Sequence, residues 1–251
     1  MGNKVLFLSD AHLGSGADTA LRERDMAALL GSVKENLAAV VLLGDIFDFW
    51  FTYRHVAPRG FTRLIGKLAE LADSGVEIHY FIGNHDMWVF DYFEKEIGAH
   101  MHAAPERLTF FGKTVLAGHG DGLNPNDRRY DMLKGIFRSP LNQRLFALAN
   151  PRLSYPIAMR WSSHSRKKHS DSMGARAEEV QGSIYQFCQR EWQGKPFDCA
   201  IFGHSHRRAA LPLAGGATYY NIGNWIERRD YVVLSEEGVE QLSWHPSNEC
   251  N

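Results

Sequence analysis

The chain has 251 residues, and its 28 lysines and arginines against 29 aspartates and glutamates give a formal charge of −1 when the 12 histidines are neutral. This length allows one large domain or two small ones, and it buries a substantial core without disulfides. With 44% hydrophobic and 23% charged residues, the composition argues against disorder, collagen-like repeats and coiled coils. The near-zero charge gives no support to a surface that binds nucleic acid as a whole.

Cysteine usage and hydropathy point to the cytoplasm. Cys188, Cys199 and Cys250 are too few and too scattered for a disulfide framework, which favours a reducing compartment. The first apolar run, residues 5–8, is too short for a signal peptide. The longest smooth apolar run, residues 38–43, is far shorter than the roughly 20 residues that a membrane span needs. We therefore expect a cytoplasmic protein.

Short apolar runs rich in β-branched and aromatic residues predict the strands. Two helical patterns, at residues 21–37 and 61–72, lie between the early runs. Alternation of strands and helices predicts an α/β fold with buried strands. The later runs follow at shorter intervals, so we expect part of the sheet to be antiparallel. The predicted strands are residues 5–8, 40–43, 78–82, 114–117, 200–202, 218–222 and 231–234.

Residues 124–175 break this alternation. They have little strand character, and their helical stretches at 130–137 and 141–148 are interrupted by Pro140, Pro151 and Pro156. Ten lysines and arginines face three aspartates here, a local charge of +7 that leaves −8 for the rest of the chain. A solvated helical surface is one explanation, but such a surface usually mixes the two signs. We favour an insertion that meets an anion.

Residues of metal-ligand type follow five of the predicted strands, each next to a glycine or a tight turn. Open α/β sheets bind their ligands at this edge. Taken singly, each motif also fits a structural role: Asp45 can cap a helix, and His12 can be a buried turn residue. Five such motifs in one order make coincidence a poor explanation. They are Asp10-Ala-His12, Gly44-Asp45, Gly83-Asn84-His85-Asp86, Gly118-His119-Gly120-Asp121 and Gly203-His204-Ser205-His206.

Seven donors in these motifs are too many for one tetrahedral zinc. They fit two divalent metal ions that share a carboxylate, and Asp45 is the natural bridge between ions roughly 3.5–4 Å apart. Imidazole and oxygen donors without a thiolate suit Mn²⁺, Fe²⁺ or Zn²⁺. The seven are Asp10, His12, Asp45, Asn84, His119, His204 and His206.

The order of these motifs resembles that of the calcineurin-like metallophosphoesterase superfamily, over nearly the whole chain. The resemblance implies a four-layer αββα sandwich, in which two mixed β-sheets lie face to face and helices flank them. It implies a single domain over residues 1–251, with a basic helical lid inserted at about 124–175. It also divides the ligands: Asp10, His12, Asp45 and His206 for one metal, and Asp45, Asn84, His119 and His204 for the other.

Further motifs are similar to those of the UDP-2,3-diacylglucosamine diphosphatases of lipid A biosynthesis. They are residues 7–14 and 44–50, His119-Gly-Asp-Gly122 with Asp127 and Tyr130, and Met159-Arg160 with Ser163. Those enzymes cleave UDP-2,3-diacylglucosamine to UMP and 2,3-diacylglucosamine 1-phosphate, commonly with Mn²⁺, and carry a basic helical insertion. Many of them have arginine after the asparagine, where this chain has His85.

Catalytic and substrate-binding roles follow as hypotheses. His85 comes directly after a ligand, so we expect it to reach the substrate, where it stabilises the transition state or protonates the leaving oxygen. Asp86 orients His85 by accepting a hydrogen bond, or it caps a helix. Arg160 and Lys167 meet phosphates. The substrate-binding residues that we expect are Asp127, Tyr130, Arg160 and Ser163, which stand in the resembling motifs, and Lys167.

The apolar residues of the insertion have two open interpretations. They line a groove for acyl chains, or they pack the helices onto the body of the protein. A basic insertion with an apolar face also lets a cytoplasmic enzyme sit on the cytoplasmic face of an anionic inner membrane. The residues concerned are Phe137, Leu141, Leu145, Phe146, Leu148 and Ile157.

Other functions remain to be separated from this one. The nearest is a phosphodiesterase or phosphatase of the same superfamily that acts on another lipid-linked pyrophosphate or a nucleotide. A compact cyclic-nucleotide enzyme has little use for the insertion. A scaffold that has lost catalysis would show eroded ligands, yet all seven are present. No nucleic-acid partner is expected, because aromatic residues are not interleaved with the basic ones as stacking requires.

Overall fold

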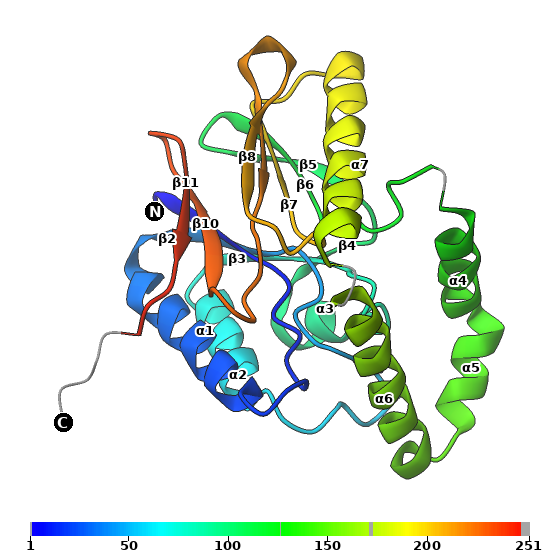
Figure 1. The fold of residues 1–251 in the computed structure, drawn as a ribbon. Coiled ribbons are helices and arrows are strands. Elements are labelled where there is room, and N and C mark those ends of the chain that lie inside the picture. The colour runs from blue at the N-terminus through cyan, green and yellow to red at the C-terminus, as the bar shows by residue number, and fades with distance from the viewer. Residues whose placement is uncertain (1, 126, 171–172, 247–251) are drawn as a thin grey trace.

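The computed structural model describes residues 2–125, 127–170 and 173–246, without the side chains at 128, 129, 161, 163–170 and 173–177 (Figure 1). Its strands are β1 (Lys4–Leu8), β2 (Leu37–Leu42), β3 (Glu77–Phe81), β4 (His100–His102), β5 (Glu106–Phe110), β6 (Lys113–Gly118), β7 (Cys199–Phe202), β8 (Ala209–Pro212), β9 (Thr218–Asn221), β10 (Asp230–Leu234) and β11 (Val239–Ser243). Its helices are α1 (Thr19–Val33), α2 (Thr62–Asp73), α3 (Tyr92–Ile97), α4 (Arg128–Arg138), α5 (Pro140–Leu148), α6 (Pro151–Ser170) and α7 (Met173–Gly194), with the short 3-10 helices η1 (Lys34–Asn36) and η2 (Ala214–Gly216).

The strands form two mixed sheets. The larger has the order β11-β10-β1-β2-β3-β4, and the smaller has the order β5-β6-β7-β9-β8. In the larger sheet β1, β2, β3 and β4 run parallel, whereas β10 and β11 are antiparallel to their neighbours. In the smaller sheet β6, β7 and β9 are parallel and the edge strands are antiparallel. Both sheets are therefore mixed, as expected.

Three hydrophobic cores separate four layers. One core lies between the larger sheet and the helices α1, α2 and α3, one lies between the two sheets, and one lies between the smaller sheet and α7. β1 shows how one strand serves two cores: Leu6 and Leu8 point to the helix side, and Val5 and Phe7 to the other sheet. The expected αββα sandwich is confirmed.

Four strands have no counterpart among the predicted apolar runs, and all four lie at sheet edges. They are β4, β5, β8 and β11. An edge strand is partly exposed and carries polar residues, as in the sequence Val-Glu-Gln-Leu-Ser of β11. The apolar runs of the sequence therefore predicted the central strands but not the edge strands.

The segment between β6 and α7 forms three helices that project from one side of the sandwich (Figure 1). Pro140 and Pro151 are the first residues of α5 and α6, a position where the missing N–H of proline costs nothing. Pro156 lies inside α6, so the expected interruption at this residue is wrong. No helix of the described part of the chain is long and apolar enough to cross a membrane.

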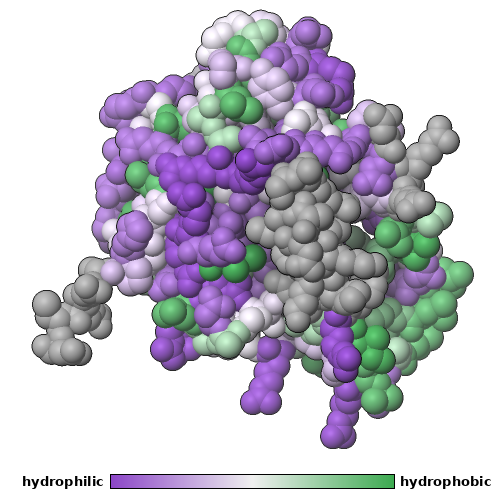
Figure 2. Space-filling model, viewed as in Figure 1, coloured by the Kyte–Doolittle hydropathy of each residue, from purple (hydrophilic) through white to green (hydrophobic). Residues whose placement is uncertain are grey.

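The apolar residues of this segment divide into two groups. Phe146 packs against Phe51 and Trp88, with ring centroids 4.8 and 4.9 Å away, and Phe137 packs against Trp88 at 5.7 Å. These contacts fasten α4 and α5 to the body. The remaining four point into solvent: Leu141, Leu145, Leu148 (84% exposed) and Ile157 (68% exposed). Figure 2 shows hydrophobic residues gathered at the lower right, where α5 lies in Figure 1.

Candidate metal centre and active site

The seven predicted ligands lie on loops that follow the central strands of both sheets. Asp10 and His12 follow β1, Asp45 follows β2, and Asn84 follows β3, all in the larger sheet. His119 follows β6 and the pair His204 and His206 follows β7, in the smaller sheet. Because the two sheets face each other, both sets of loops converge at one end of the sandwich.

One group of donors consists of Asp10, His12 and His206, whose ligand atoms all lie within 4.8 Å of one another. His206 Nε2 is 3.1 Å from Asp10 Oδ1 and 3.4 Å from His12 Nε2. Asp10 and His12 are buried, whereas the side chain of His206 is 32% exposed. This is an arrangement of donors around a common point.

A second group consists of Asp45, His119 and His204. His119 Nε2 lies 3.4 Å from Asp45 Oδ2 and 3.2 Å from His204 Nδ1. The amide oxygen of Asn84 completes the group, 3.1 Å from His119 Nε2. The structure therefore brings the remaining predicted donors together as well.

Asp45 lies between the two groups. Its Oδ2 is 3.6 Å from His12 Nε2 on one side and 3.4 Å from His119 Nε2 on the other. Its Oδ1 accepts a hydrogen bond of 2.8 Å from the backbone N–H of His85. One carboxylate thus faces both sets of imidazoles.

The chemistry of this donor set fits two divalent cations. Asp10 Oδ1 is buried 3.1 Å from His206 Nε2 but makes no hydrogen bond of good geometry among the described residues, which is costly for a carboxylate oxygen unless a cation neutralises it. Imidazole nitrogens of different residues point at one another at 3.2 and 3.4 Å. Nitrogen and oxygen donors that converge in this way suit a metal site better than a packed core.

Protonation preferences within the centre follow from burial and charge. Burial opposes ionisation of Asp10, but His206 outweighs it and lowers the pKa of Asp10 to about 2. Burial likewise opposes the charged form of His119, yet Asp45 raises the pKa of His119 to about 10. Burial lowers the pKa of His12 to about 4. The carboxylates therefore favour their ionised form, and a cation held by His119 would require this imidazole to lose its proton.

Five of the seven ligands have a left-handed backbone conformation, with φ between 42° and 67°. Residues other than glycine rarely adopt this conformation, and the surroundings must hold it in place. Gly203 shows how tightly the loops approach, because a Cβ atom at this position would lie 2.5 Å from Asp10 Oδ2. The five are Asp10, His12, Asp45, His204 and His206.

Hydrogen bonds around the ligands fix these loops. Ser9 Oγ donates to Asp10 Oδ2 at 2.7 Å, and the backbone N–H of His204 donates to the same oxygen at 2.9 Å. His119 Nδ1 lies 2.8 Å from the carbonyl of Leu43, which leaves its Nε2 for a metal. The amide of Asn224 donates to the carbonyl of His206 at 3.2 Å. Each contact orients a ligand or its loop.

A buried arginine supports the first ligand loop from behind. The Arg22 side chain of α1 donates to the carbonyl of Ala11 at 2.9 Å and also to the carbonyl of Ser15. The indole of Trp225 donates to the carbonyl of Arg22 at 3.0 Å, and the Trp225 N–H donates to the carbonyl of Asp10 at 3.2 Å. The loop that carries Asp10 and His12 is therefore tied to α1 and to the C-terminal part of the chain.

His85 lies at the edge of the centre, and its side chain is 11% exposed. One of its ring nitrogens is within 4.8 Å of donor atoms of His12 and Asp45. Its Nδ1 is 2.7 Å from Ser162 Oγ and 3.2 Å from the carbonyl of Asp48. His85 is thus close enough to act on a substrate at the centre.

Asp86 has partners other than those expected for an orienting carboxylate. Its buried side chain accepts hydrogen bonds from the hydroxyl of Tyr80 (2.6 Å) and the N–H groups of Gly83 and Ile46 (both 2.9 Å). Burial, together with the charge of Asp45, raises the pKa of Asp86 to about 6. The expected hydrogen bond from His85 to Asp86 is therefore wrong: Asp86 holds together the loops after β2 and β3.

The predicted substrate-binding residues are spread over the helical segment. Asp127 caps α4 by accepting from the N–H of Tyr130 at 3.0 Å, and the Tyr130 hydroxyl donates to Asp121 at 2.8 Å. Arg160 is exposed on α6. The side chains of Ser163 and Lys167 lie outside the described part of the structure. Asp127 and Tyr130 consequently organise the start of α4 beside the centre.

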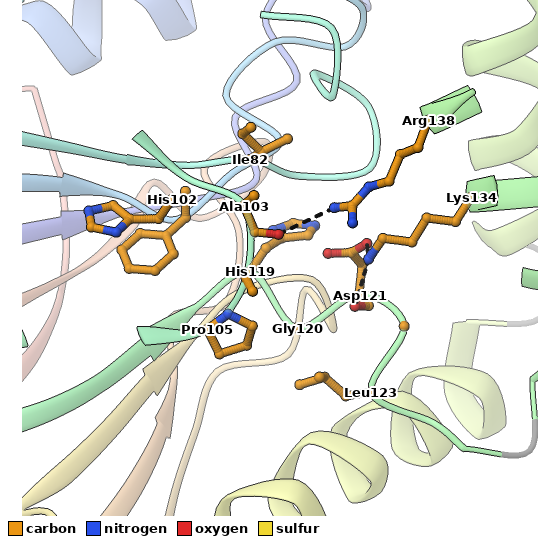
Figure 3. Close-up of a pocket in the computed structure, with 13 residues that line it drawn as sticks. Ile82, His102, Ala103, Pro105, His119, Gly120, Asp121, Leu123, Lys134 and Arg138 are labelled. Atoms are coloured by element: carbon orange, nitrogen blue, oxygen red, sulfur yellow. Dashed lines mark hydrogen bonds and ion pairs between the residues drawn. The ribbon is translucent and has the colours of Figure 1, made fainter. Parts of the chain in front are cut away.

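A cavity of about 190 Å³ adjoins His119 on the α4 side (Figure 3). Lys134 and Arg138 point into it from α4: Lys134 Nζ lies 2.5 Å from Asp121 Oδ2, and Arg138 donates to the carbonyl of Ala103 at 3.3 Å. The other walls are mostly apolar. They include Phe81, Ile82, Ala104, Pro105 and Leu123.

Two residues of the site escape sequence reasoning. Asp48 is buried with its Oδ1 3.5 Å from His12 Nδ1 and 3.7 Å from His85 Nδ1, and Ser162 contacts His85 from α6. Asp48 lies within residues 44–50, which carry the resemblance to a known family, but nothing in this aromatic run singles out its side chain for a chemical role. Ser162 is distant in sequence, and only the docking of α6 brings it to the site.

Comparison with known proteins agrees with this geometry. The calcineurin-like phosphoesterase family matches residues 3–208. A UDP-2,3-diacylglucosamine hydrolase of Porphyromonas gingivalis is 38% identical over 248 residues, covering 93% of this chain and 94% of that protein. One from Haemophilus influenzae is 27% identical over 242 residues, covering 93% and 95%.

Among solved structures, Vacuolar Protein Sorting 29 from Cryptosporidium parvum has a TM-score of 0.52 at 13% identity, covering 99% of this chain and 94% of that one. This likeness concerns the fold alone. The family match spans more than half of the chain and contains all seven donors. The chain belongs to the calcineurin-like phosphoesterase family.

Proposed function

We propose that this protein hydrolyses the pyrophosphate bond of UDP-2,3-diacylglucosamine, with water, to UMP and 2,3-diacylglucosamine 1-phosphate. The observation that carries the proposal is the convergence of seven donors on Asp45, with His85 beside them and an apolar, basic helical segment next to the site. The similar proteins from P. gingivalis and H. influenzae bear the name of this activity.

Asp10, His12, Asp45 and His206 would hold one cation, and Asp45, Asn84, His119 and His204 the other. Mn²⁺, Fe²⁺ and Zn²⁺ all suit these donors, and we propose Mn²⁺. Two divalent cations in this centre would activate water and offset the charge that develops on the phosphoryl oxygens. His85 then donates a hydrogen bond to a phosphoryl oxygen or a proton to the leaving oxygen.

Residues 1–251 form, in this proposal, one domain in which residues 124–175 act as a lid. Arg160 and Lys167 would meet phosphate oxygens, with Ser163 and the α4 residues Asp127 and Tyr130 beside them. The exposed leucines and Ile157 would meet the acyl chains and the membrane surface from which the lipid comes.

The two ends of the substrate would lie on opposite sides of α4. The cavity beside His119 combines apolar walls with the cations Lys134 and Arg138, which suits the nucleotide half. The acyl chains have no place there and would lie along α5 and α6, where apolar side chains are exposed.

The substrate is tested directly by product analysis. Purified protein with Mn²⁺ and detergent-dispersed UDP-2,3-diacylglucosamine should release UMP and 2,3-diacylglucosamine 1-phosphate in equal amounts, measured by mass spectrometry. Replacing a ligand, His119→Asn, should lower kcat by about 100-fold or more, because the charge stabilisation is lost. The matched change His100→Asn, at the exposed start of β4, should have no effect. Absence of UMP, with brisk turnover of another phosphoester, would discard this substrate and leave the family assignment intact.

The nucleotide cavity is tested by Arg138→Ala. Loss of the guanidinium should raise KM for the UDP-linked substrate and the inhibition constant of UMP about tenfold, because a charge-assisted hydrogen bond to phosphate is removed. Hydrolysis of a small aryl phosphodiester should change little. Arg63→Ala, an exposed arginine on α2, is the control. Unchanged inhibition by UMP in the Arg138→Ala variant would contradict this placement.

Membrane association is tested with vesicles. The double change Leu148→Asp and Leu153→Asp should lower binding to vesicles of phosphatidylglycerol and phosphatidylcholine at least about tenfold in a sedimentation assay, since each leucine contributes about 1.5–3 kcal/mol when buried. Leu21→Asp, an exposed leucine of α1, should bind as the unchanged protein does. Equal binding of all three proteins would argue against a peripheral membrane enzyme.

A further inference from the structure

The imidazole of His85 is held by a residue of α6. His85 Nδ1 lies 2.7 Å from Ser162 Oγ and 3.2 Å from the carbonyl oxygen of Asp48, and the Ser162 hydroxyl donates to that same carbonyl at 2.7 Å. Ser162 is 6% exposed, although it belongs to a helix that projects from the body. Two groups from distant parts of the chain, the Ser162 hydroxyl and the Asp48 carbonyl, thus meet at one ring nitrogen of His85.

The donors and acceptors in this triad allow one consistent arrangement. The Asp48 carbonyl only accepts, and a serine hydroxyl donates one hydrogen while accepting others. When Ser162 donates to the carbonyl, its oxygen is left to accept from a proton on His85 Nδ1, and the carbonyl accepts from the same N–H. A proton on Nδ1 therefore satisfies every contact. Nε2 is the nitrogen left to face a substrate oxygen, to which it donates when it also carries a proton.

Neighbouring groups restrict the ring further. Asp48 Oδ1 lies 3.7 Å from His85 Nδ1, which also favours a proton on that nitrogen. The ring of His12 packs edge-on against that of His85, with centroids 4.7 Å apart and an interplanar angle of 85°. The backbone N–H of His85 is bound to Asp45. The hydrogen bond to Ser162 restricts rotation of the His85 ring.

α6 presents two different faces. Tyr155, seven residues before Ser162 and hence on the same side of the helix, donates from its hydroxyl to the carbonyl of Phe49 at 3.4 Å. Leu153, Ile157 and Arg160 lie on the outer side and are exposed. The face that would meet lipid and the face that holds His85 therefore belong to one helix.

We propose that Ser162 is a positioning residue: it accepts from the Nδ1 proton of His85 and holds Nε2 toward the substrate, so that His85 is competent only while α6 is docked on the site. This inference rests on the proposed phosphoester hydrolysis but not on the identity of the lipid. It assigns a role to the helical segment in the chemical step, separate from binding of the substrate.

The kinetic test uses a small aryl phosphodiester and the UDP-linked lipid in parallel. Ser162→Ala should lower kcat for both substrates at least about tenfold with KM nearly unchanged, since a misplaced acid or hydrogen-bond donor affects the transition state. Ser162→Thr keeps the hydroxyl and should restore most of kcat. Ser154→Ala, on the same helix but without a contact to His85, is the matched control.

A double-mutant cycle separates positioning from general support of the fold. In a His85→Ala background, Ser162→Ala should cause no further loss, because the ring that it positions is absent. An equal loss in both backgrounds would overturn the proposal, as would full activity of Ser162→Ala in the presence of a functional His85.

A spectroscopic readout does not depend on turnover. In two-bond ¹H–¹⁵N spectra of the metal-free protein, His85 should show the Nδ1-protonated tautomer, and Ser162→Ala should shift it toward a mixture of the two tautomers. A ring that carries its proton on Nε2 alone in the unchanged protein would overturn the assignment. If the lipid is not hydrolysed while the tautomer and aryl-ester results hold, the proposed substrate fails and the role of Ser162 stands.

Discussion

The carboxylate of Asp45 is the group on which the arrangement of the site depends. It follows a central strand of the larger sheet, yet its Oδ2 lies 3.4 Å from His119, which is carried by the smaller sheet. A carboxylate that is 2% exposed is costly to bury unless positive charge and hydrogen bonds surround it. Imidazoles from both sheets and the N–H of His85 supply them. Burial opposes ionisation of Asp45, but the charge of His119 outweighs it and leaves the pKa of Asp45 well below its ordinary value. The donors of the centre therefore come together only when the two sheets pack against each other.

Backbone strain accompanies this arrangement. Five ligands adopt left-handed conformations that cost of order 1–3 kcal/mol each in residues other than glycine. The surrounding loops hold them through close approach and hydrogen bonds. A Cβ atom at Gly83 would overlap the Oδ1 and N atoms of Asp45, and Asn221 binds the carbonyl of Gly203 at 2.6 Å. Strain of this kind is expected where a site is shaped for a ligand rather than for stability alone. The glycines next to the ligands are thus part of the metal centre, although they donate nothing to it.

The sequence predicted what is local and missed what depends on docking. Continuous apolar runs identify the central strands, because these are buried on both faces, and the ligands are found because they follow those strands. Edge strands such as β4 and β11 carry polar residues and leave no such signal. Asp86 was expected to orient His85 because the two residues are adjacent. The carboxylate of Asp86 instead accepts hydrogen bonds from Tyr80 and from backbone N–H groups. The partners of His85 are Ser162 and Asp48, which chain folding alone brings near. Pro156 was expected to interrupt a helix, but α6 continues through it.

Anomalous diffraction from crystals of the Mn²⁺-loaded protein tests the central claim most directly. Two manganese peaks should appear roughly 3.5–4 Å apart, one on either side of the Asp45 carboxylate. One should lie among Asp10, His12 and His206, and the other among Asn84, His119 and His204. A single peak, or two peaks that do not share Asp45, would contradict the account.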